Sequence, residues 1–584
     1  MNRFASRLLS FLMIFSGAAG IATAQTAHAD GGHTTAVCGT AIMEAQRGPY
    51  MTPEEVRRSN PEEYRRLMEQ SKASSSASRI ASDDDIIDFF TVDAGSGNYK
   101  TVTAKLVFYG QYMRLWIDVA DTVRVKKADI LRVSRALDTA TDPRSRNPNN
   151  GIVKNNVELF GKEPTDVALD EGTDFLLTNL ANPGVLGYFS PGDQLPKTEN
   201  LHSNARNLLY VDDKEGFANM EVLLSTIAHE HQHLIHYGRN QASRSASRSD
   251  LTIYNEGLAE LASILNGYYD RGITTYMANP NVDIFRYTRD DLGKQNADYE
   301  RATNFLLYLH EQFGEKFTYD IVGLGDVGML RINSALELSG YNLSQFDWRQ
   351  VMRNYTVANY VKVPPEGHPE WGIRHTKFQT TKVTPVATYT TTGFPPSSFV
   401  DLQRYGSAYY VYNNPGVFNY RYSANHPAQV MAIYYKDNVF WGAEPLEPDR
   451  DYELGHWNGP FSRIVLGVVG LANESVTVNW TAAPVTLGIA EEMSAASGLR
   501  IAPLSPNPVR DEAIIHFTAA SGAEEILLEL YDARGERVST LFEGRGIAGG
   551  MSVGFDASAL SSGVYLLRLR QGDRMVTRSV IVSK

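Results

Sequence analysis

The sequence predicts a multidomain α+β protein, in which a region of mixed helices and strands is followed by two all-β sandwich domains. Three observations support this prediction. The chain has 584 residues, more than one hydrophobic core normally organises. Helical stretches separated by Gly-, Pro- and Asn-rich turns run through residues 126–370. Alternating Thr- and Tyr-rich runs replace them from about residue 380.

The first residues have the features of an export signal. Arg3 and Arg7 precede a short apolar run, Leu8–Ile14, and the small-x-small sequence Ala22–Ala24 follows it. We therefore expect residues 1–24 to be a signal peptide. The apolar run is too short to span a bilayer, and no later stretch approaches about 18 apolar residues. The sequence predicts an exported chain with no membrane-spanning segment.

Residues 25–85 are expected to form a poorly packed propeptide and linker. The sequence Thr52-Pro53-Glu54-Glu55 begins a short charged helix, and a Ser/Ala-rich stretch with little to bury follows at residues 71–82. The acidic run at residues 83–85, together with Asp88, matches no known calcium loop. Calcium therefore stays possible but unsupported, and we expect a solvated linker there.

Alternating apolar and β-branched residues predict where the strands lie. Residues 86–125 are expected to be rich in strands, with strands at 101–108 and 113–119. A β-sandwich domain is expected at 380–485 and a smaller β domain at 501–584, separated by an Ala/Ser/Glu-rich linker.

The charge composition of the chain argues against a nucleic-acid partner. The formal net charge is -12, and nucleic-acid binding calls for a basic face. We therefore expect no nucleic-acid partner. Cys38 is the single cysteine, so the chain forms no intramolecular disulfide.

The most informative segment is residues 223–238, LLSTIAHEHQHLIHYG. Its apolar positions predict a largely buried helix that ends near the glycine. His229 and His233 are four residues apart, so one helical turn places both imidazoles on one face, where they share a zinc ion. Glu230 lies on the flank of that face and is expected to take the proton from the hydrolytic water.

A catalytic zinc usually has three protein ligands and an open position. A third His six residues after His233, the metzincin spacing, is excluded because Arg239 stands there. The sequence Asn255-Glu256-Gly257 begins a second expected helix, from about residue 256 to 266, that would pack beside the first. Glu256 is the predicted third zinc ligand. Glu260, one turn later, is placed to orient a ligand histidine.

Several other residues leave alternatives open. His231 and His236 are expected at the surface or in a second layer rather than on the metal. Tyr299 either donates a hydrogen bond to the oxyanion or packs between helices, and His310 is expected to pack. The thiolate of Cys38 either occupies the open zinc position and keeps a precursor inactive, or is incidental.

The pattern His-Glu-x-x-His followed by Asn-Glu resembles the gluzincin metallopeptidases. The surrounding segments look like the hyicolysin-like and immune-inhibitor-A-like secreted neutral proteases over roughly residues 130–370. Those segments are Phe160-Gly161, Leu186–Phe189, Ser203-Asn204, Leu209–Asp212, Asp298-Tyr299, Phe305–Leu309 and Phe313-Gly314. One departure is Thr252-Ile253, which stand where an aromatic residue often precedes Asn-Glu-Gly. The resemblance implies a zincin-like catalytic domain at 126–370.

The last β domain carries a second resemblance. It looks like the C-terminal sorting domain of the type nine secretion system. The blocks that carry this resemblance are Ser505–Pro508, Leu528–Arg534, Gly549-Gly550, Phe555-Asp556, Leu560–Tyr565 and Ile581–Lys584. The resemblance implies contact with that secretion machinery, passage across the outer membrane, and release or attachment at the cell surface.

The leading expectation is therefore a secreted zinc endopeptidase that acts on extracellular proteins and peptides. A zinc aminopeptidase is one alternative, but Asn219–Val222 matches the Gly-x-Met-Glu-Asn amine anchor of those enzymes only in part and lies too near His229. A surface adhesion protein with an inactive peptidase domain is the second alternative.

Overall fold

The computed structural model describes most of the chain, and the predicted signal peptide, most of the Ser/Ala-rich stretch and the linker before the last domain lie outside the described residues. The described residues are 38–40, 43, 50–74, 85–93, 98–165, 172–181, 185–240, 249–268, 271–288, 292–390, 397–455, 461–485, 498–504, 507–519, 525–532, 535–545, 549–572 and 574–584. Within them, no helix is both long enough and apolar enough to cross a bilayer.

The chain divides into two compact units. The first comprises Met1–Asn155, Glu163–Leu234 and Leu265–Tyr269, and the second comprises Asn156–Lys162, Ile235–Ile264 and Asp270–Lys584. The predicted catalytic range, 126–370, contributes to both units. Helices and several β-sheets together make a multidomain α+β architecture whose C-terminal part is rich in strands.

A mixed six-stranded sheet organises the first unit. Its order is β1 (Ile86–Val92), β2 (Tyr99–Tyr109), β3 (Met113–Asp118), β4 (Thr173–Thr178), β6 (Leu208–Asp212) and β5 (Gly187–Phe189). The strands predicted at 101–108 and 113–119 are confirmed as β2 and β3. The sheet also crosses the boundary predicted at residue 125, because β3 pairs in parallel with β4. The short strand β5 lies at the edge, antiparallel to β6.

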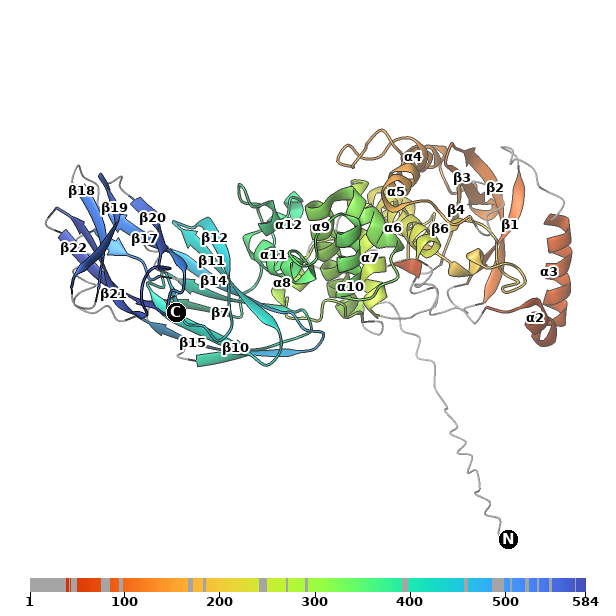
Figure 1. The fold of residues 1–584 in the computed structure, drawn as a ribbon. Coiled ribbons are helices and arrows are strands. Elements are labelled where there is room, and N and C mark those ends of the chain that lie inside the picture. The colour runs from red at the N-terminus through yellow and green to blue at the C-terminus, as the bar shows by residue number, and fades with distance from the viewer. Residues whose placement is uncertain are drawn as a thin grey trace, which may run out of the picture. The chain divides into compact units, whose positions relative to one another are not determined.

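Two short helices precede this sheet, α2 (Pro53–Ser59) and α3 (Pro61–Ser74). A capping box between Thr52 and Glu55 starts α2, as the charged-helix prediction expects. Val56 and Leu67 are buried against Phe90 and Leu201 of the first unit, and Figure 1 shows α2 and α3 beside β1. The prediction that residues 25–85 are poorly packed is therefore wrong for this part, because a few apolar residues on polar helices suffice when a sheet edge covers them.

The acidic run before the sheet is also placed differently from the prediction. Asp88 lies within β1 and accepts a hydrogen bond from Thr103 on β2. It therefore belongs to a strand pair rather than to a solvated linker. Residues 83 and 84 lie outside the described part of the chain.

The predicted metal helix is α6 (Met220–Arg239), which confirms the helix predicted for residues 223–238. Other helices of this region are α4 (Lys127–Asp138) and α5 (Ile152–Phe160). The second predicted helix is α7 (Ser249–Leu265), which begins seven residues earlier than residue 256.

The second unit continues with helices packed around α9. These are α8 (Thr274–Ala278), α9 (Leu292–Gly323), α10 (Met329–Leu338), α11 (Trp348–Val361) and α12 (Thr376–Gln379). The long α9 breaks at Gly314, where φ is 80°, a conformation that suits glycine.

Two sheets follow these helices and share one aromatic core. One sheet has the order β13 (Tyr452–Leu454), β10 (Phe418–Ala424), β15 (Val476–Pro484) and β8 (Ser397–Leu402). The other has the order β12 (Val439–Leu446), β11 (Ala428–Lys436), β14 (Arg463–Gly470), β9 (Ser407–Asn413) and β7 (Ala387–Thr390). Tyr410 of the second sheet meets Trp480 of the first at a ring distance of 4.5 Å, so the two inner faces pack as a sandwich.

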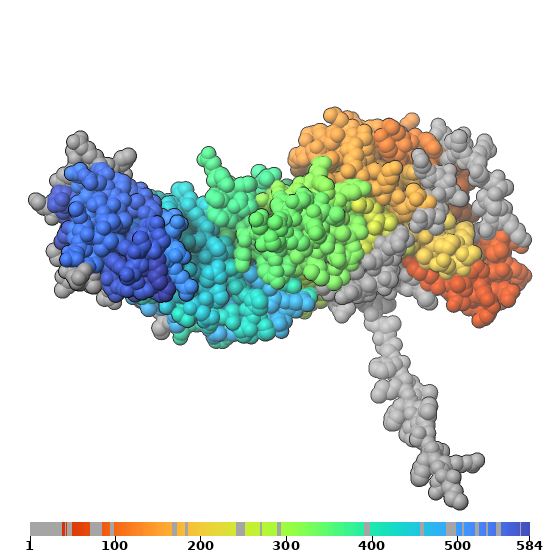
Figure 2. All heavy atoms as spheres, in the orientation of Figure 1, coloured from red at the N-terminus to blue at the C-terminus, as the bar shows by residue number. Residues whose placement is uncertain are grey.

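The last strands form a separate pair of sheets with a core of their own. One sheet has the order β16 (Arg500–Ile501), β17 (Glu512–Ala519) and β20 (Gly549–Asp556). The other has the order β19 (Arg537–Arg545), β18 (Glu525–Tyr531), β21 (Gly563–Gln571) and β22 (Arg574–Val582). Figure 2 shows these residues, in blue, packed as one body.

Candidate metal centre

Helix α6 is buried around most of its circumference. Leu223, Ile227 and Leu234 are each at most 1% exposed, so packing on several sides fixes the direction of the polar side chains between them. His229 is 6% exposed, Glu230 is 1% exposed and His233 is 2% exposed. Three titratable side chains within two turns of a buried helix need partners, because an unpaired buried polar group is costly.

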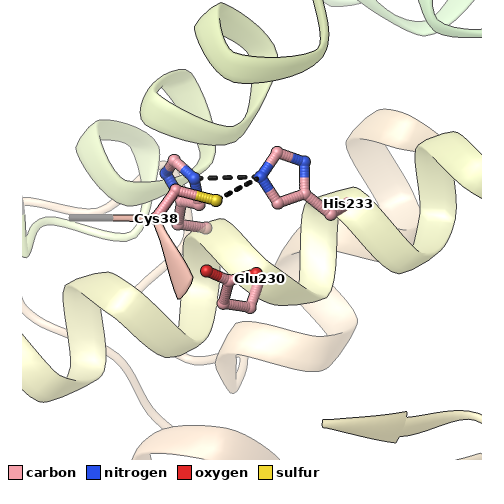
Figure 3. Close-up of side chains that lie close together, drawn as sticks. Cys38, Glu230 and His233 are labelled. Atoms are coloured by element: carbon pink, nitrogen blue, oxygen red, sulfur yellow. Dashed lines mark hydrogen bonds between the residues drawn. The ribbon is translucent and has the colours of Figure 1, made fainter. Parts of the chain in front are cut away.

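The two histidines point at one another. Their Nε2 atoms are 3.0 Å apart and their rings are nearly perpendicular, with centroids 4.7 Å apart. The Cys38 Sγ atom lies 3.4 Å from His233 Nε2, and Figure 3 shows the sulfur directed at that ring. The potential ligand atoms of Cys38, His229, Glu230 and His233 all lie within 4.8 Å of one another, and all four residues are buried.

The spacing of these donors fits a small tetrahedral metal ion. Zinc bonds of about 2.0 Å to nitrogen and about 2.3 Å to sulfur place two nitrogens about 3.3 Å apart, and a nitrogen and a sulfur about 3.6 Å apart. The separations of 3.0 Å between the imidazoles and 3.4 Å between thiol and imidazole are within a few tenths of an ångström of these values. Imidazole and thiolate are also ligands that suit zinc.

The Glu230 carboxylate is held by hydrogen bonds from two directions. The edge strand β5 contributes the N–H of Phe189, which donates to Oε2 at 3.2 Å. The N-terminal segment contributes the Gly39 N–H, which donates to Oε1 at 3.2 Å, and the Thr40 hydroxyl, which donates to Oε2 at 2.6 Å. These donors fix the carboxylate beside the two imidazoles, where it can exchange a proton with a bound molecule.

His231 faces away from this cluster and is fully buried. Its Nε2 atom lies 3.2 Å from a carboxylate oxygen of Glu163. Burial raises the pKa of the Glu163 carboxyl, but the hydrogen bond and charge of His231 outweigh burial and leave the pKa below its usual value. A surface position is therefore wrong for His231, and its place in a second layer stays a prediction.

His236 is also buried. Its Nδ1 atom lies 2.5 Å from the Asn255 side-chain oxygen on α7, and Arg331 lies 3.2 Å from its Nε2 atom. A surface position is therefore wrong for His236 too. The physical reason is that α7 and α10 cover the last turn of α6 within the second unit, which the sequence of α6 alone does not reveal.

The remaining predicted site residues belong to the second unit. Glu256 lies on α7 and is 3% exposed, and its role as third ligand stays a prediction. Glu260 is ion-paired with Arg271 at 3.2 Å, and the Arg271 guanidinium lies 4.7 Å from the ring centre of Tyr299. The Tyr299 hydroxyl accepts a hydrogen bond from Tyr287 at 3.0 Å. The role of Glu260 in orienting a histidine and the oxyanion role of Tyr299 stay predictions.

His310 packs within its own helix region, as expected, with Nδ1 2.8 Å from the Thr318 hydroxyl. No pattern in the sequence pointed to Gly39, Thr40 or the Phe189 N–H as neighbours of Glu230. The one signal in this segment was Cys38, whose thiolate the sequence analysis named as a candidate for the open zinc position.

Comparisons with known proteins identify the C-terminal part of the chain. Residues 504–583 match the family model described as the secretion system C-terminal sorting domain. No curated protein sequence matches the chain.

Solved structures give only weak similarities. PorZ, a surface component of the type IX secretion system of Porphyromonas gingivalis, is 18% identical over 20% of this chain and 15% of its own, with a TM-score of 0.12. Latent PorU of Porphyromonas gingivalis is 14% identical over 34% and 19%, with a TM-score of 0.14. Ruminococcus gnavus β-glucuronidase is 11% identical over 30% and 34%, with a TM-score of 0.12.

The chain therefore spans about a third or less of each of these structures, and TM-scores this low carry no argument about function. The match over residues 504–583 is different, because it covers most of the C-terminal β domain with its separate core. This part of the chain is a type IX secretion sorting domain, which directs the protein through that machinery to the cell surface or the medium.

Proposed function

We propose that the protein is an exported zinc-dependent endopeptidase with a zincin-like catalytic domain, in which His229 and His233 bind the metal and Glu230 is the general base. The observation that carries this proposal is the pair of buried imidazole Nε2 atoms 3.0 Å apart on one helix, with the Glu230 carboxylate beside them. A buried pair of facing imidazoles with a thiol and a carboxylate is a donor set that zinc satisfies.

Glu256 is the proposed third ligand of the open catalytic site. The hydrogen bond between His236 and Asn255 ties α7 to the last turn of α6, the helix that carries both histidines. Gly257 lies against α9, since a Cβ atom there would be 2.9 Å from Leu306 Cδ2 and 3.0 Å from the Ala302 carbonyl oxygen. The Asn-Glu-Gly sequence thus supplies a hydrogen bond to α6 through Asn255, a carboxylate through Glu256, and a close contact with α9 at Gly257.

The reaction follows from the roles of the side chains. Zinc, when bound, supplies a Lewis acid that polarises the scissile carbonyl and makes water more acidic. Glu230 accepts the proton of the attacking water and delivers it to the leaving amine. The Phe189 N–H holds the Glu230 carboxylate in place for both transfers. Tyr299, beside the Arg271 guanidinium, is the proposed hydrogen-bond donor to the developing oxyanion.

Metal content and proteolysis test this proposal together. Zinc is measured in the wild type, in Glu230→Gln and in the double variant His229→Ala/His233→Ala. Casein hydrolysis is measured in Cys38→Ala/Thr40→Val, which removes the side chains that contact His233 and Glu230, with and without Glu230→Gln. We expect one zinc per chain except in the histidine double variant, and hydrolysis that is lost with Glu230→Gln.

Three outcomes contradict the proposal. Absence of zinc from the wild type rejects the ligand assignment. One zinc per chain, without hydrolysis of casein or of aminoacyl substrates, rejects the peptidase and favours a surface binding protein. Hydrolysis of aminoacyl substrates alone would instead identify an aminopeptidase.

A further inference from the structure

We propose that Cys38 is itself a ligand of the metal, and that the segment Cys38–Thr40, hereafter the plug, closes the site and keeps the exported chain latent. This inference rests on the proposed function. Three consecutive residues each make a different contact with the same centre, so the inference does not depend on the cysteine alone.

The first contact is that of the thiol. Cys38 is 4% exposed, and its sulfur lies 3.4 Å from His233 Nε2. It belongs to the same cluster as His229 and Glu230, with all ligand atoms within 4.8 Å. A sulfur at that distance from one imidazole fits a common tetrahedral ion. Coordination forms one metal–sulfur bond, releases the thiol proton to solvent and displaces water from the metal, with no change in oxidation state.

The second contact is that of Gly39, at a position where only glycine fits. A Cβ atom there would lie 1.9 Å from the carbonyl oxygen of Gly187 and 2.7 Å from Val185 Cγ1. The backbone of the plug therefore lies directly against the edge strand β5. In this position the Gly39 N–H donates to Glu230 Oε1 at 3.2 Å.

The third contact is that of Thr40, which takes the place of a water on the base. Its hydroxyl donates to Glu230 Oε2 at 2.6 Å and accepts from the Phe189 N–H at 2.8 Å. These are the partners that a water would use while giving its proton to Glu230. With the thiol on the metal and the hydroxyl on the base, the plug occupies both positions that the hydrolytic water needs.

Cobalt substitution tests the thiol contact without depending on activity. The full-length chain is loaded with Co(II) in place of zinc, and the near-ultraviolet absorption is recorded for the wild type and for Cys38→Ser. A thiolate bound to Co(II) gives a charge-transfer band there. We expect the band in the wild type and its loss in Cys38→Ser, with the same amount of cobalt bound per chain. Cobalt binding without the band in the wild type overturns the inference and leaves the proposed function intact.

Activity tests the plug as a whole. Casein hydrolysis is compared among the wild type, Cys38→Ala, Gly39→Ala and Thr40→Val. We expect each variant to hydrolyse casein about tenfold faster than the wild type, since each weakens the closed state by about one factor of ten in its equilibrium constant. The matched controls are Gly554→Ala, where a Cβ atom meets nothing within 4 Å, and the exposed Thr139→Val, and both should behave as the wild type.

Gly39→Ala is the most discriminating variant, because it keeps the thiol and the hydroxyl and changes only their placement. If the wild type hydrolyses casein, and the three plug variants and Cys38→Ala/Thr40→Val all retain metal but are no faster than the wild type, the inference of latency fails. If no chain binds metal, the proposed function itself fails. The two failures are therefore distinguishable.

Discussion

Glu230 differs from its neighbours on α6 in having every described partner supplied by the backbone or by a hydroxyl rather than by a cation. Its carboxylate accepts hydrogen bonds from Phe189, Gly39 and Thr40. Asp174 elsewhere in the same unit is instead neutralised by Arg114 and by Arg206. The carboxylate of Glu230 is therefore positioned by neutral hydrogen-bond donors, without an ion pair like that of Asp174.

Lys362 is a second residue in an unusual environment, at the C-terminus of α11. It is 3% exposed, and its Nζ atom lies 3.2 Å from the Met277 sulfur. Burial lowers the pKa of its amine to about 7. The lysine therefore destabilises the fold most below that pH, and the penalty shrinks as the pH rises from about 7 toward 10.5.

Replacing this lysine should stabilise the protein in a pH-dependent way. The folded pKa of about 7 lies below the ordinary value of 10.5, so the unfolded chain binds more protons between these two values and wild-type stability rises with pH across that window. We expect Lys362→Met to raise the thermal unfolding midpoint by several degrees at pH 6, with a gain that shrinks toward pH 10. Thermal unfolding at four pH values measures it, with the exposed Lys382→Met as control. A gain that is the same at every pH would contradict the assigned cause.

At the scale of elements, a hydrogen bond between His236 and Asn255 joins the last turn of α6 to α7 within the second unit. The tie between His236 and Asn255 lies three residues after His233 and one residue before Glu256. Arg331 stands on the other side of His236, and burial lowers the pKa of its guanidinium to about 10. Its Nε and Nη2 atoms donate hydrogen bonds to the carbonyl oxygens of Ile321 and Val322, so this arginine joins the last turn of α6 to the end of α9.

Removing the hydrogen bond between His236 and Asn255 should weaken metal binding without removing a proposed ligand. We expect Asn255→Ala to lower zinc affinity by about tenfold, the effect typical of residues that position a ligand. Competition with a chelator of known affinity measures it, and circular dichroism checks that the helices remain. Asn425→Ala, in the sandwich, is the matched control. An unchanged affinity in Asn255→Ala would show that α7 is held by other contacts or that Glu256 does not bind the metal.

At the scale of the whole molecule, secretion and the proposed catalysis reside in separate folding regions. The sorting domain has a core formed by its own residues, from Leu499 to Val582. The cluster of Cys38, His229, Glu230 and His233, the candidate metal centre, lies in the first unit. Because the domain has its own core, its removal should affect export without changing the metal centre.

Deleting residues 501–584 tests this separation. We expect the truncated chain, expressed in a bacterium with a type IX secretion system, to stay in the periplasm while it binds as much zinc as the full chain. Cell fractionation with immunoblotting measures location, and metal analysis measures binding. Equal release of the truncated and full chains would show that export depends on another part of the protein.

Sequence reasoning predicted the elements whose signals are local. The helix at 220–239, the strands at 99–109 and 113–118, and the capped helix at 53–59 follow from periodicity and start signals. It also placed both histidines and Glu230 together, because four residues in a helix are one turn apart. The C-terminal sorting domain was predicted differently, from the resemblance of blocks of residues in a fixed order to a known family.

Only the tertiary structure could show which residues from distant parts of the chain contact α6. Cys38 reaches His233 across 195 residues of sequence, and Thr40 reaches Glu230 across 190. Contacts of such separation depend on how β5 and the N-terminal segment pack, and no spacing along the chain encodes that. The sequence by itself thus determined the donors on one helix and the export of the chain. The fold decided that its own N-terminal segment occupies the site, because burial and close approach are properties of packing rather than of pattern.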